Sequence, residues 1–279
     1  MSSNSRHVTI ALAVLCLCGA AATHAQTDTA RTVTVNGMQM HYRAVGTGAP
    51  LLLLHSGTQS GEMWAPFVEA LASRYRLIIP DLRGHGRSTN PAGPLATRRF
   101  ADDVLALMDL LEIPRARAIG ASAGGMALLH AATAHPERFD ALVVVGVGTD
   151  LPKECRATLA RTSTDDLSEA SWQALRARHT HGDTQIRALY AWIASLAADT
   201  DDMKIDPARL SAITAPTLIV HGDRDYCFPA SMAWEIYRAV PTSYLWVVPN
   251  GTHVPLSGSN AATFTETVLA FFAGNWRQR

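Results

Sequence analysis

The chain has 279 residues; 48% are hydrophobic and 17% are charged, and 24 acidic residues balance 24 basic ones. This composition fits a compact globular protein with one sizeable core and excludes a largely disordered chain. Because acidic and basic residues balance, the composition gives no support for nucleic acid or an anionic membrane as a partner, and we expect neither.

The first 25 residues differ in character from the rest of the chain. Arg6 and His7 precede an apolar run over 8–22, and Thr23 and Ala25 are small residues at the positions that a signal peptidase inspects. The run is shorter than the roughly 20 apolar residues of a membrane-spanning helix. Residues 1–25 therefore predict a cleaved secretory signal peptide, with an uncleaved anchor as the alternative. After cleavage we expect no membrane association and a periplasmic or secreted protein.

The following segments alternate between strand and helix patterns. Asn36-Gly37 is a strong hairpin signal between the first two predicted strands, and Asp102 and Asp103 form an acidic first turn of the second predicted helix. The predicted strands are 32–35, 38–43, 51–54, 77–79, 116–119, 141–145, 216–220 and 244–248. The predicted helices are 64–71, 100–111, one starting at 122, 231–239 and 263–272. This alternation predicts an α/β protein whose mostly parallel central sheet carries helices on both faces.

The alternation stops between residues 150 and 210, where several helix-like pieces occur without a convincing strand. An inserted helical cap is the simplest explanation, since structureless loops of that length are rare in compact domains. The predicted organisation is a signal peptide over 1–25, a first part of the core over 26–149, a cap over 150–212 and a second part of the core over 213–279.

A serine lies at the turn between one predicted strand and the next helix. The sequence Gly120-Ala-Ser122-Ala-Gly124 directly follows the apolar strand 116–119 and directly precedes a helical pattern. A serine at the tip of such a turn has an exposed hydroxyl, and the two glycines let strand and helix approach closely. The pattern alone is a weak signal, and its placement between a strand and a helix makes it a strong one. The alternative role for Ser122 is that of a helix N-cap.

Candidate partners of Ser122 follow the last two predicted strands. Asp223 and Asp225 follow the strand after the predicted cap, and His253 follows the final strand. The carboxyl ends of parallel strands meet at one edge of a sheet, so these side chains are expected close to Ser122. A serine hydroxyl becomes a nucleophile when a neighbouring base, oriented by a third group, accepts its proton.

With these motifs the chain resembles the α/β-hydrolase superfamily, in particular its cap-bearing serine hydrolases: esterases, enol-lactonases and haloperoxidase-like enzymes. The resemblance rests on 51–57, 81–88, 119–125, 221–225 and 251–253 and so covers almost the whole mature chain. It implies Ser122 as nucleophile, His253 as general base and Asp225 as orienting carboxylate. The family usually uses the later of the two acids, which favours Asp225 over Asp223.

The resemblance also implies two backbone donors for an oxyanion. One is the N–H of Ala123, at the start of the helix after the serine. The other comes from the loop after residue 54, where the family commonly has His-Gly and this chain has His55-Ser56-Gly57. Gly57 is the expected donor, but because of the additional residue Ser56 the position of the donor is open by one residue. In this family the histidines at positions 55 and 85 usually brace loops.

Other reactive side chains are interpreted without a catalytic role. His179 and His181 have no carboxylate–histidine grouping around them, so we predict a solvated face and no metal. Cys155 and Cys227 remain after signal cleavage and fall on loops predicted at one sheet edge. A disulfide and two unpaired thiols are equally compatible with the sequence.

The sequence thus predicts a secreted serine hydrolase that cleaves a small carboxylic ester or lactone through an acyl-enzyme, without cofactor or metal. A carbon–carbon hydrolase or a proline iminopeptidase-like amide hydrolase would use the same three residues and is the alternative. A ligand-binding module that has lost turnover is a third possibility. Substrate identity and oligomeric state stay open.

Overall fold

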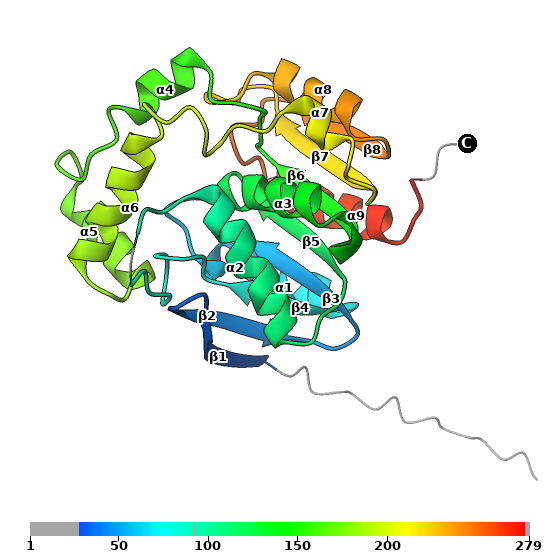
Figure 1. The fold of residues 1–279 in the computed structure, drawn as a ribbon, viewed down its shortest axis with the longest axis horizontal. Helices are drawn as coiled ribbons and strands as arrows, with labels where there is room; N and C mark the ends of the chain where they lie inside the picture. The colour runs from blue at the N-terminus through cyan, green and yellow to red at the C-terminus, as the bar shows by residue number, and fades with distance from the viewer. Residues whose placement is uncertain (1–27, 92, 277–279) are drawn as a thin grey trace, which may run out of the picture.

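A computed structural model describes residues 28–91 and 93–276, and the predicted signal peptide over 1–25 lies outside them (Figure 1). In this part of the chain, eight strands form one sheet in the order β1-β2-β4-β3-β5-β6-β7-β8. The strands are β1 Asp28–Val35, β2 Met38–Val45, β3 Ala49–Leu54, β4 Tyr75–Pro80, β5 Ala116–Ala121, β6 Phe139–Val145, β7 Thr217–Gly222 and β8 Ser243–Val248. β2 is antiparallel to β1 and β4, and the remaining pairs are parallel. The predicted mostly parallel sheet is confirmed.

The leucine run of β3 explains why a central strand lacks polar alternation. Leu52 and Leu54 belong to the core on one face of the sheet, whereas Leu51 and Leu53 belong to the core on the other face. All four side chains are fully buried. A parallel strand that is covered on both faces selects apolar residues at every position, because successive side chains point to opposite sides.

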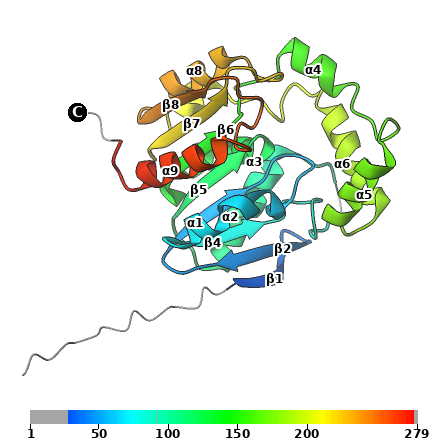
Figure 2. The same cartoon turned by 180° about the vertical axis from the view of Figure 1, so that it is seen from behind.

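Helices cover both faces of the sheet, as Figures 1 and 2 show from opposite sides. Side chains of α2, α3 and α8 contribute to one core and those of α1 and α9 to the other. The helices are α1 Ala65–Ala72, α2 Thr97–Leu110, α3 Ala123–Ala134, α4 Lys153–Leu159, α5 Glu169–Arg178, α6 Asp183–Ser195, α7 Pro207–Leu210, α8 Ala230–Ala239 and α9 Asn260–Phe272, with short 3-10 turns at Gly61–Trp64 and Pro136–Arg138.

The prediction that Asp102 and Asp103 form the first turn of a helix is wrong, because α2 begins at Thr97. The Thr97 N–H donates to Oδ1 of Asp202 at 2.7 Å, so a residue 105 positions away caps this helix. Asp103 is buried in the second turn, where both of its oxygens accept hydrogen bonds from Arg83 at 2.7 Å. Its carboxylate therefore joins α2 to the loop after β4.

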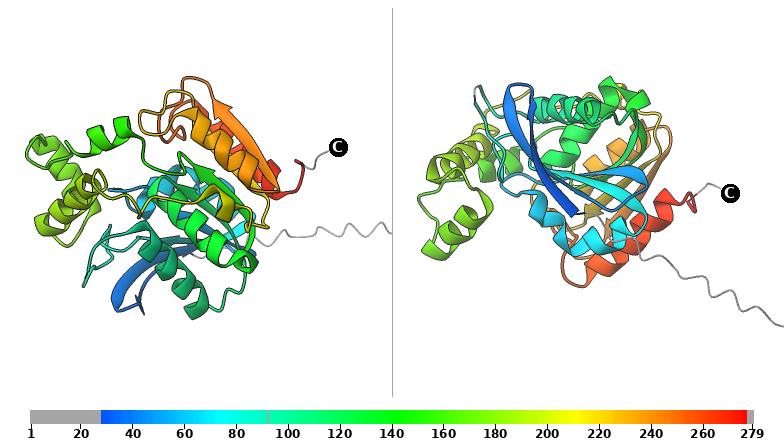
Figure 3. Two further views of the ribbon diagram at one scale, coloured as in Figure 1. Left: turned by 45° about the horizontal axis from the view of Figure 1, so that its top comes forward. Right: turned by 90° about the horizontal axis from the view of Figure 1, so that it is seen from below.

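Between β6 and β7 the structure contains helices α4 to α7 and no strand within the described residues. In Figure 1 and in both views of Figure 3, α4, α5 and α6 lie together beyond one edge of the sheet. The predicted boundaries of the cap, 150 and 212, stay a prediction. Across residues 28–91 and 93–276, no helix is long and apolar enough to cross a membrane.

Candidate active site

The turn from β5 to α3 holds Ser122 in an unusual backbone conformation. Its φ is 48° and its ψ is −117°, and its N–H donates to the carbonyl of Val145 at 2.8 Å. The Ser122 hydroxyl makes no capping hydrogen bond to α3. Ser122 is thus the N-cap residue of α3 by position, but its hydroxyl does not cap the helix and is available for another partner.

The two glycines that flank this turn are required by close backbone contacts. A Cβ atom at Gly120 would lie 2.6 Å from the carbonyl oxygen of Gly124. A Cβ atom at Gly124 would lie 2.6 Å from the carbonyl oxygens of both Leu54 and His55. The absence of side chains at these positions lets α3 start directly against the end of β3, which places Ser122 beside the loop after that strand.

Three side chains that are far apart in sequence meet at this turn. Oγ of Ser122 lies 2.9 Å from Nε2 of His253, and Nδ1 of His253 lies 2.9 Å from Oδ2 of Asp225. When Nδ1–H donates to the carboxylate, Nε2 keeps the lone pair that accepts the Ser122 hydroxyl proton. The geometry thus links an acid, a base and a hydroxyl in one chain of hydrogen bonds.

Asp225 is held from two sides. Its Oδ1 accepts the backbone N–H groups of Cys227 at 2.7 Å and Phe228 at 3.0 Å, which leaves Oδ2 for His253. Burial would raise the pKa of Asp225, but the hydrogen bonds and charge of His253 and the two N–H groups outweigh it and hold the pKa below its ordinary value. The Asp225 side chain is 0% exposed, whereas that of Asp223 is 36% exposed and lies 3.9 Å from Arg224.

The loop that carries His253 packs against two glycines that the sequence analysis did not single out. Gly146, with a φ of 60°, directly follows β6, and a Cβ atom there would collide with the carbonyl oxygen of His253. Gly222 ends β7, and a Cβ atom there would collide with the carbonyl of Thr252. A glycine at the carboxyl end of two adjacent strands is the sequence signal that could have revealed this close approach.

The predicted oxyanion donors lie around the same point. Ala123 is the first residue of α3, so its N–H is one of those that a helix leaves without an intrahelical acceptor. Ser56, Gly57 and Ala123 all line the cavity that also contains Ser122. The choice of Gly57 as second donor stays a prediction.

A cavity of about 360 Å³ opens above Ser122. Its walls come from the loop after β3, from α4 and α6, and from the loops after β7 and β8. It is lined by Ser56, Gly57, Thr58, Gln59, Ser122, Ala123, Leu151, Thr158, Leu159, Thr162, Tyr190, Trp192, Ile193, Leu196, Met203, Tyr226, Cys227, Phe228 and His253. The segment between β6 and β7 thus supplies much of the wall that a bound molecule would meet.

The prediction of a solvated face for His179 is wrong, because this side chain is 1% exposed. Its Nδ1 accepts the N–H of Gly86 at 2.9 Å, and its Nε2–H donates to the carbonyl of Thr58 at 3.1 Å. His179 therefore fastens the end of α5 to two loops that follow core strands. His55 and His85 brace loops as expected: His55 accepts from the N–H of Leu82 at 2.9 Å, and Nδ1 of His85 bonds the carbonyl of Arg83.

The buried hydrogen bonds of His179 are expected to make the free energy of unfolding depend on pH. Burial lowers the pKa of His179 to about 4. An unfolded histidine binds a proton below about pH 6.5, so between pH 6.5 and 4 the unfolded chain holds more protons than the folded one. We expect the free energy of unfolding to fall as the pH falls through this window, with His179 contributing up to about 1.4 kcal/mol per pH unit. Urea unfolding at pH 7, 6 and 5 measures how the free energy of unfolding changes with pH.

The variant His179→Gln should be less stable at pH 7 and should show a shallower decline below pH 6.5. The matched control is His181→Gln, since His181 is exposed two residues away; its decline should follow that of the unmodified protein. If the free energy of unfolding declined equally with falling pH in the unmodified protein and in His179→Gln, His179 would not be the source of the pH dependence.

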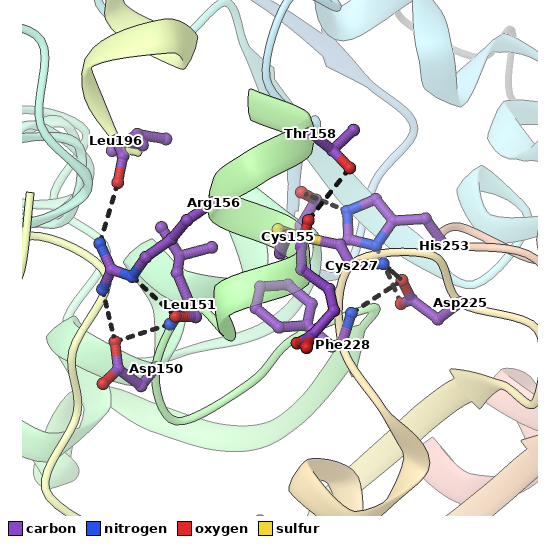
Figure 4. The surroundings of a disulfide bond; sticks show 12 residues. Asp150, Leu151, Cys155, Arg156, Thr158, Leu196, Asp225, Cys227, Phe228 and His253 are labelled. Atoms are coloured by element: carbon purple, nitrogen blue, oxygen red, sulfur yellow. Dashed lines mark hydrogen bonds and ion pairs between the residues drawn. A yellow bond between two sulfur atoms is a disulfide. The ribbon is translucent and has the colours of Figure 1, made fainter. Parts of the chain in front are cut away.

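Cys155 and Cys227 form a disulfide, which decides between the two alternatives that the sequence left open (Figure 4). The expectation that both cysteines lie on loops is wrong for Cys155, which lies within α4. Cys227 lies in the loop after β7, as expected. The bond ties α4 to the residue whose N–H donates to Asp225. It therefore connects the segment between β6 and β7 directly to the Asp225 turn.

We expect reduction of this disulfide to lower the free energy of unfolding by about 2–4 kcal/mol, because the bond closes a long loop with a sequence separation of 72. Thermal unfolding with and without dithiothreitol measures the effect. The double variant Cys155→Ser/Cys227→Ser is the control, since its melting temperature should not respond to the reductant. If dithiothreitol left the melting temperature of the unmodified protein unchanged, the prediction would be contradicted.

No group of three or more histidine, cysteine, aspartate or glutamate side chains within the described residues could hold a metal ion.

Comparison with known proteins defines the class to which this fold and site belong. Residues 49–165 match the family model of the alpha/beta hydrolase fold. The chain is 31% identical over 271 residues to a Caulobacter vibrioides protein whose name ascribes carbamate hydrolysis to it, covering 86% of this chain and 97% of that protein. It is 30% identical to a pimeloyl-[acyl-carrier protein] methyl ester esterase of Xanthomonas campestris, over 84% of this chain and 99% of the relative.

A solved structure agrees with these relatives. The enol-lactonase from Burkholderia xenovorans LB400 superposes with a TM-score of 0.70 at 26% identity, covering 87% of this chain and 100% of that one. The chain belongs to the α/β-hydrolase family, and it is a hydrolase.

Proposed function

We propose that the protein is a serine hydrolase that cleaves a small carboxylic ester or lactone through an acyl-enzyme. The observation that carries this proposal is the hydrogen-bonded series Asp225–His253–Ser122, with both distances at 2.9 Å, beside a cavity of about 360 Å³. Two of the relatives described above are named as an ester hydrolase and a lactonase, which supports a carbon–oxygen bond as the target.

In the proposed reaction, Oγ of Ser122 attacks the substrate carbonyl while Nε2 of His253 accepts the hydroxyl proton. Asp225 keeps the imidazole in the tautomer with Nδ1–H and stabilises the imidazolium that forms. His253 then donates the proton to the departing alcohol oxygen, which leaves the acyl group on Ser122. Water, deprotonated by the same imidazole, releases the acid and restores the serine.

The oxyanion of each tetrahedral intermediate requires donors that are already oriented. We assign this role to the N–H groups of Ala123 and Gly57, which line the cavity beside Ser122. The start of α3 adds the positive end of a helix dipole at Ala123.

The test is hydrolysis of a short p-nitrophenyl ester by the purified protein, together with covalent labelling by a fluorophosphonate. The proposal expects turnover, and a mass increase on the peptide that contains Ser122. A protein that binds such esters without turnover and resists labelling would instead be a binding module.

We also propose that the protein is exported to the periplasm or the cell exterior. The leader-like residues 1–25 support this location, as does the disulfide between Cys155 and Cys227, since such bonds persist in oxidising compartments. Detection of the protein in a periplasmic fraction with a mature N-terminus near residue 26 is the expected result.

A further inference from the structure

The cavity above Ser122 has walls without a formal charge. Among the described residues, its lining contains no lysine, arginine, aspartate or glutamate, and the titratable imidazole is that of His253. One group of lining residues is apolar: Leu151, Leu159, Trp192, Ile193, Leu196, Met203 and Phe228. Another carries neutral hydroxyl or amide groups: Ser56, Thr58, Gln59, Thr158, Thr162, Tyr190 and Tyr226. Apart from the N–H groups assigned to the oxyanion, such walls offer apolar surface and neutral dipoles, and no opposite charge for a carboxylate of the substrate itself.

Arg156 contacts two lining residues, Leu151 and Leu196, through their backbone carbonyls. Its Nε donates to the carbonyl of Leu151 at 2.8 Å, and its Nη1 donates to the backbone carbonyls of Leu196, at 3.2 Å, and of Asp199. Its Nη2 lies 3.0 Å from the carboxylate of Asp150, as Figure 4 shows. Its charge is therefore paired with Asp150, and Arg156 itself is not part of the lining.

Arg178 is a second cation near the cavity. Its Nη1 donates to the carbonyl of Thr58 at 3.3 Å, so it touches a lining residue through the backbone. Arg178 itself is not part of the lining. Burial lowers the pKa of its guanidinium, and the nearby Tyr190 phenol acts in the opposite direction. Arg178 is therefore a cation whose role in anion recognition the experiment has to test.

We infer that the substrate is an uncharged ester or lactone, and that the cavity rejects substrates with a carboxylate on the part that it encloses. This inference rests on the function proposed above. A carboxylate that enters these walls loses its water without gaining a charged partner, which is costly, whereas a neutral ester of the same size loses little. Selectivity therefore arises from an unpaired charge and not from shape.

The experiment compares two esters that differ by one methyl group: mono-p-nitrophenyl adipate, which ends in a carboxylate, and its methyl ester, which is neutral. Release of p-nitrophenol gives kcat/KM for both. We expect the neutral ester to be favoured by on the order of 100-fold. A ratio below about 10, with hydrolysis that depends on Ser122, would overturn the inference and leave the proposed function intact. Hydrolysis that does not depend on Ser122 would contradict the proposed function itself.

Two substitutions at Thr162 locate the origin of the selectivity. Thr162 lines the cavity between α4 and α5 and is half-buried, so a longer side chain can be accommodated. In the variant Thr162→Lys, kcat/KM for the adipate monoester should rise by at least about 10-fold relative to kcat/KM for its methyl ester. In Thr162→Met, whose side chain has a similar bulk, the ratio of the two kcat/KM values should not change. If Thr162→Lys kept its melting temperature and the ratio of the two kcat/KM values did not change, the inference would be overturned.

Arg178→Gln completes the test, because glutamine keeps a donor for the Thr58 carbonyl and removes the charge. The ratio should stay within about twofold of that of the unmodified protein, since an arginine outside the lining does not pair with bound substrate. A selective loss of adipate hydrolysis in this variant would show that Arg178 recognises an anion, and would overturn the inference.

Discussion

Replacing Ser122 by alanine is expected to lower kcat for a p-nitrophenyl ester by about 10⁶-fold. The substitution removes the attacking oxygen, which lies 2.9 Å from Nε2 of His253, and no acyl-enzyme can form. A small residual rate above that in water should persist, because the oxyanion donors and the cavity remain. The measurement is steady-state p-nitrophenol release, together with loss of fluorophosphonate labelling.

The control for this variant is Ser56→Ala. Ser56 lines the same cavity, and its hydroxyl contacts the sulfur of Met63 at 3.7 Å. We expect its kcat to stay within about fivefold of the original, since no proton transfer runs through that hydroxyl. Alanine and serine tolerate the φ of 48° at position 122 to a similar degree, so the melting temperature of Ser122→Ala should be nearly unchanged. More than 1% of the original activity in Ser122→Ala would mean that another group attacks the ester.

The parts of this fold that the sequence predicts are those determined by neighbouring residues. Asn36 and Gly37 produce the hairpin because both adopt positive φ, at 44° and 76°. The run 51–54 produces a buried central strand because both faces of the sheet are covered. The segment around Ser122 is local at Gly120, which contacts the start of α3, whereas Gly124 also contacts Leu54 and His55 at the end of β3.

The parts that the sequence did not predict depend on partners far along the chain. The start of α2 is set by Asp202, and the burial of His179 is set by Gly86 and Thr58, neither of which is near it in sequence. The disulfide was left open because a sequence does not give the distance between two cysteines; in the structure their Cα atoms lie 4.5 Å apart. Such contacts have no periodic signal, so the sequence offers candidates without choosing among them.

Replacing Asp225 by asparagine is expected to lower kcat by about 10⁴-fold. Asparagine keeps an oxygen that can accept the N–H groups of Cys227 and Phe228, so the turn should survive and the melting temperature should change little. Its NH₂ group, however, donates where the carboxylate accepted. The His253 Nδ1 must then accept, which moves the ring proton to Nε2, and the atom facing Ser122 can no longer take its proton.

The matched control is Asp223→Asn, two residues away on the same turn. Asp223 is exposed and its carboxylate lies near Arg224, so its kcat should stay within about twofold of the original. The two variants remove the same charge at nearly the same place in the sequence, and only Asp225 touches the imidazole. A general electrostatic effect of the turn would lower kcat in both variants, whereas control of the His253 tautomer lowers it only in Asp225→Asn. Similar losses in the two variants, or a larger loss in Asp223→Asn, would show that Asp225 does not orient the base.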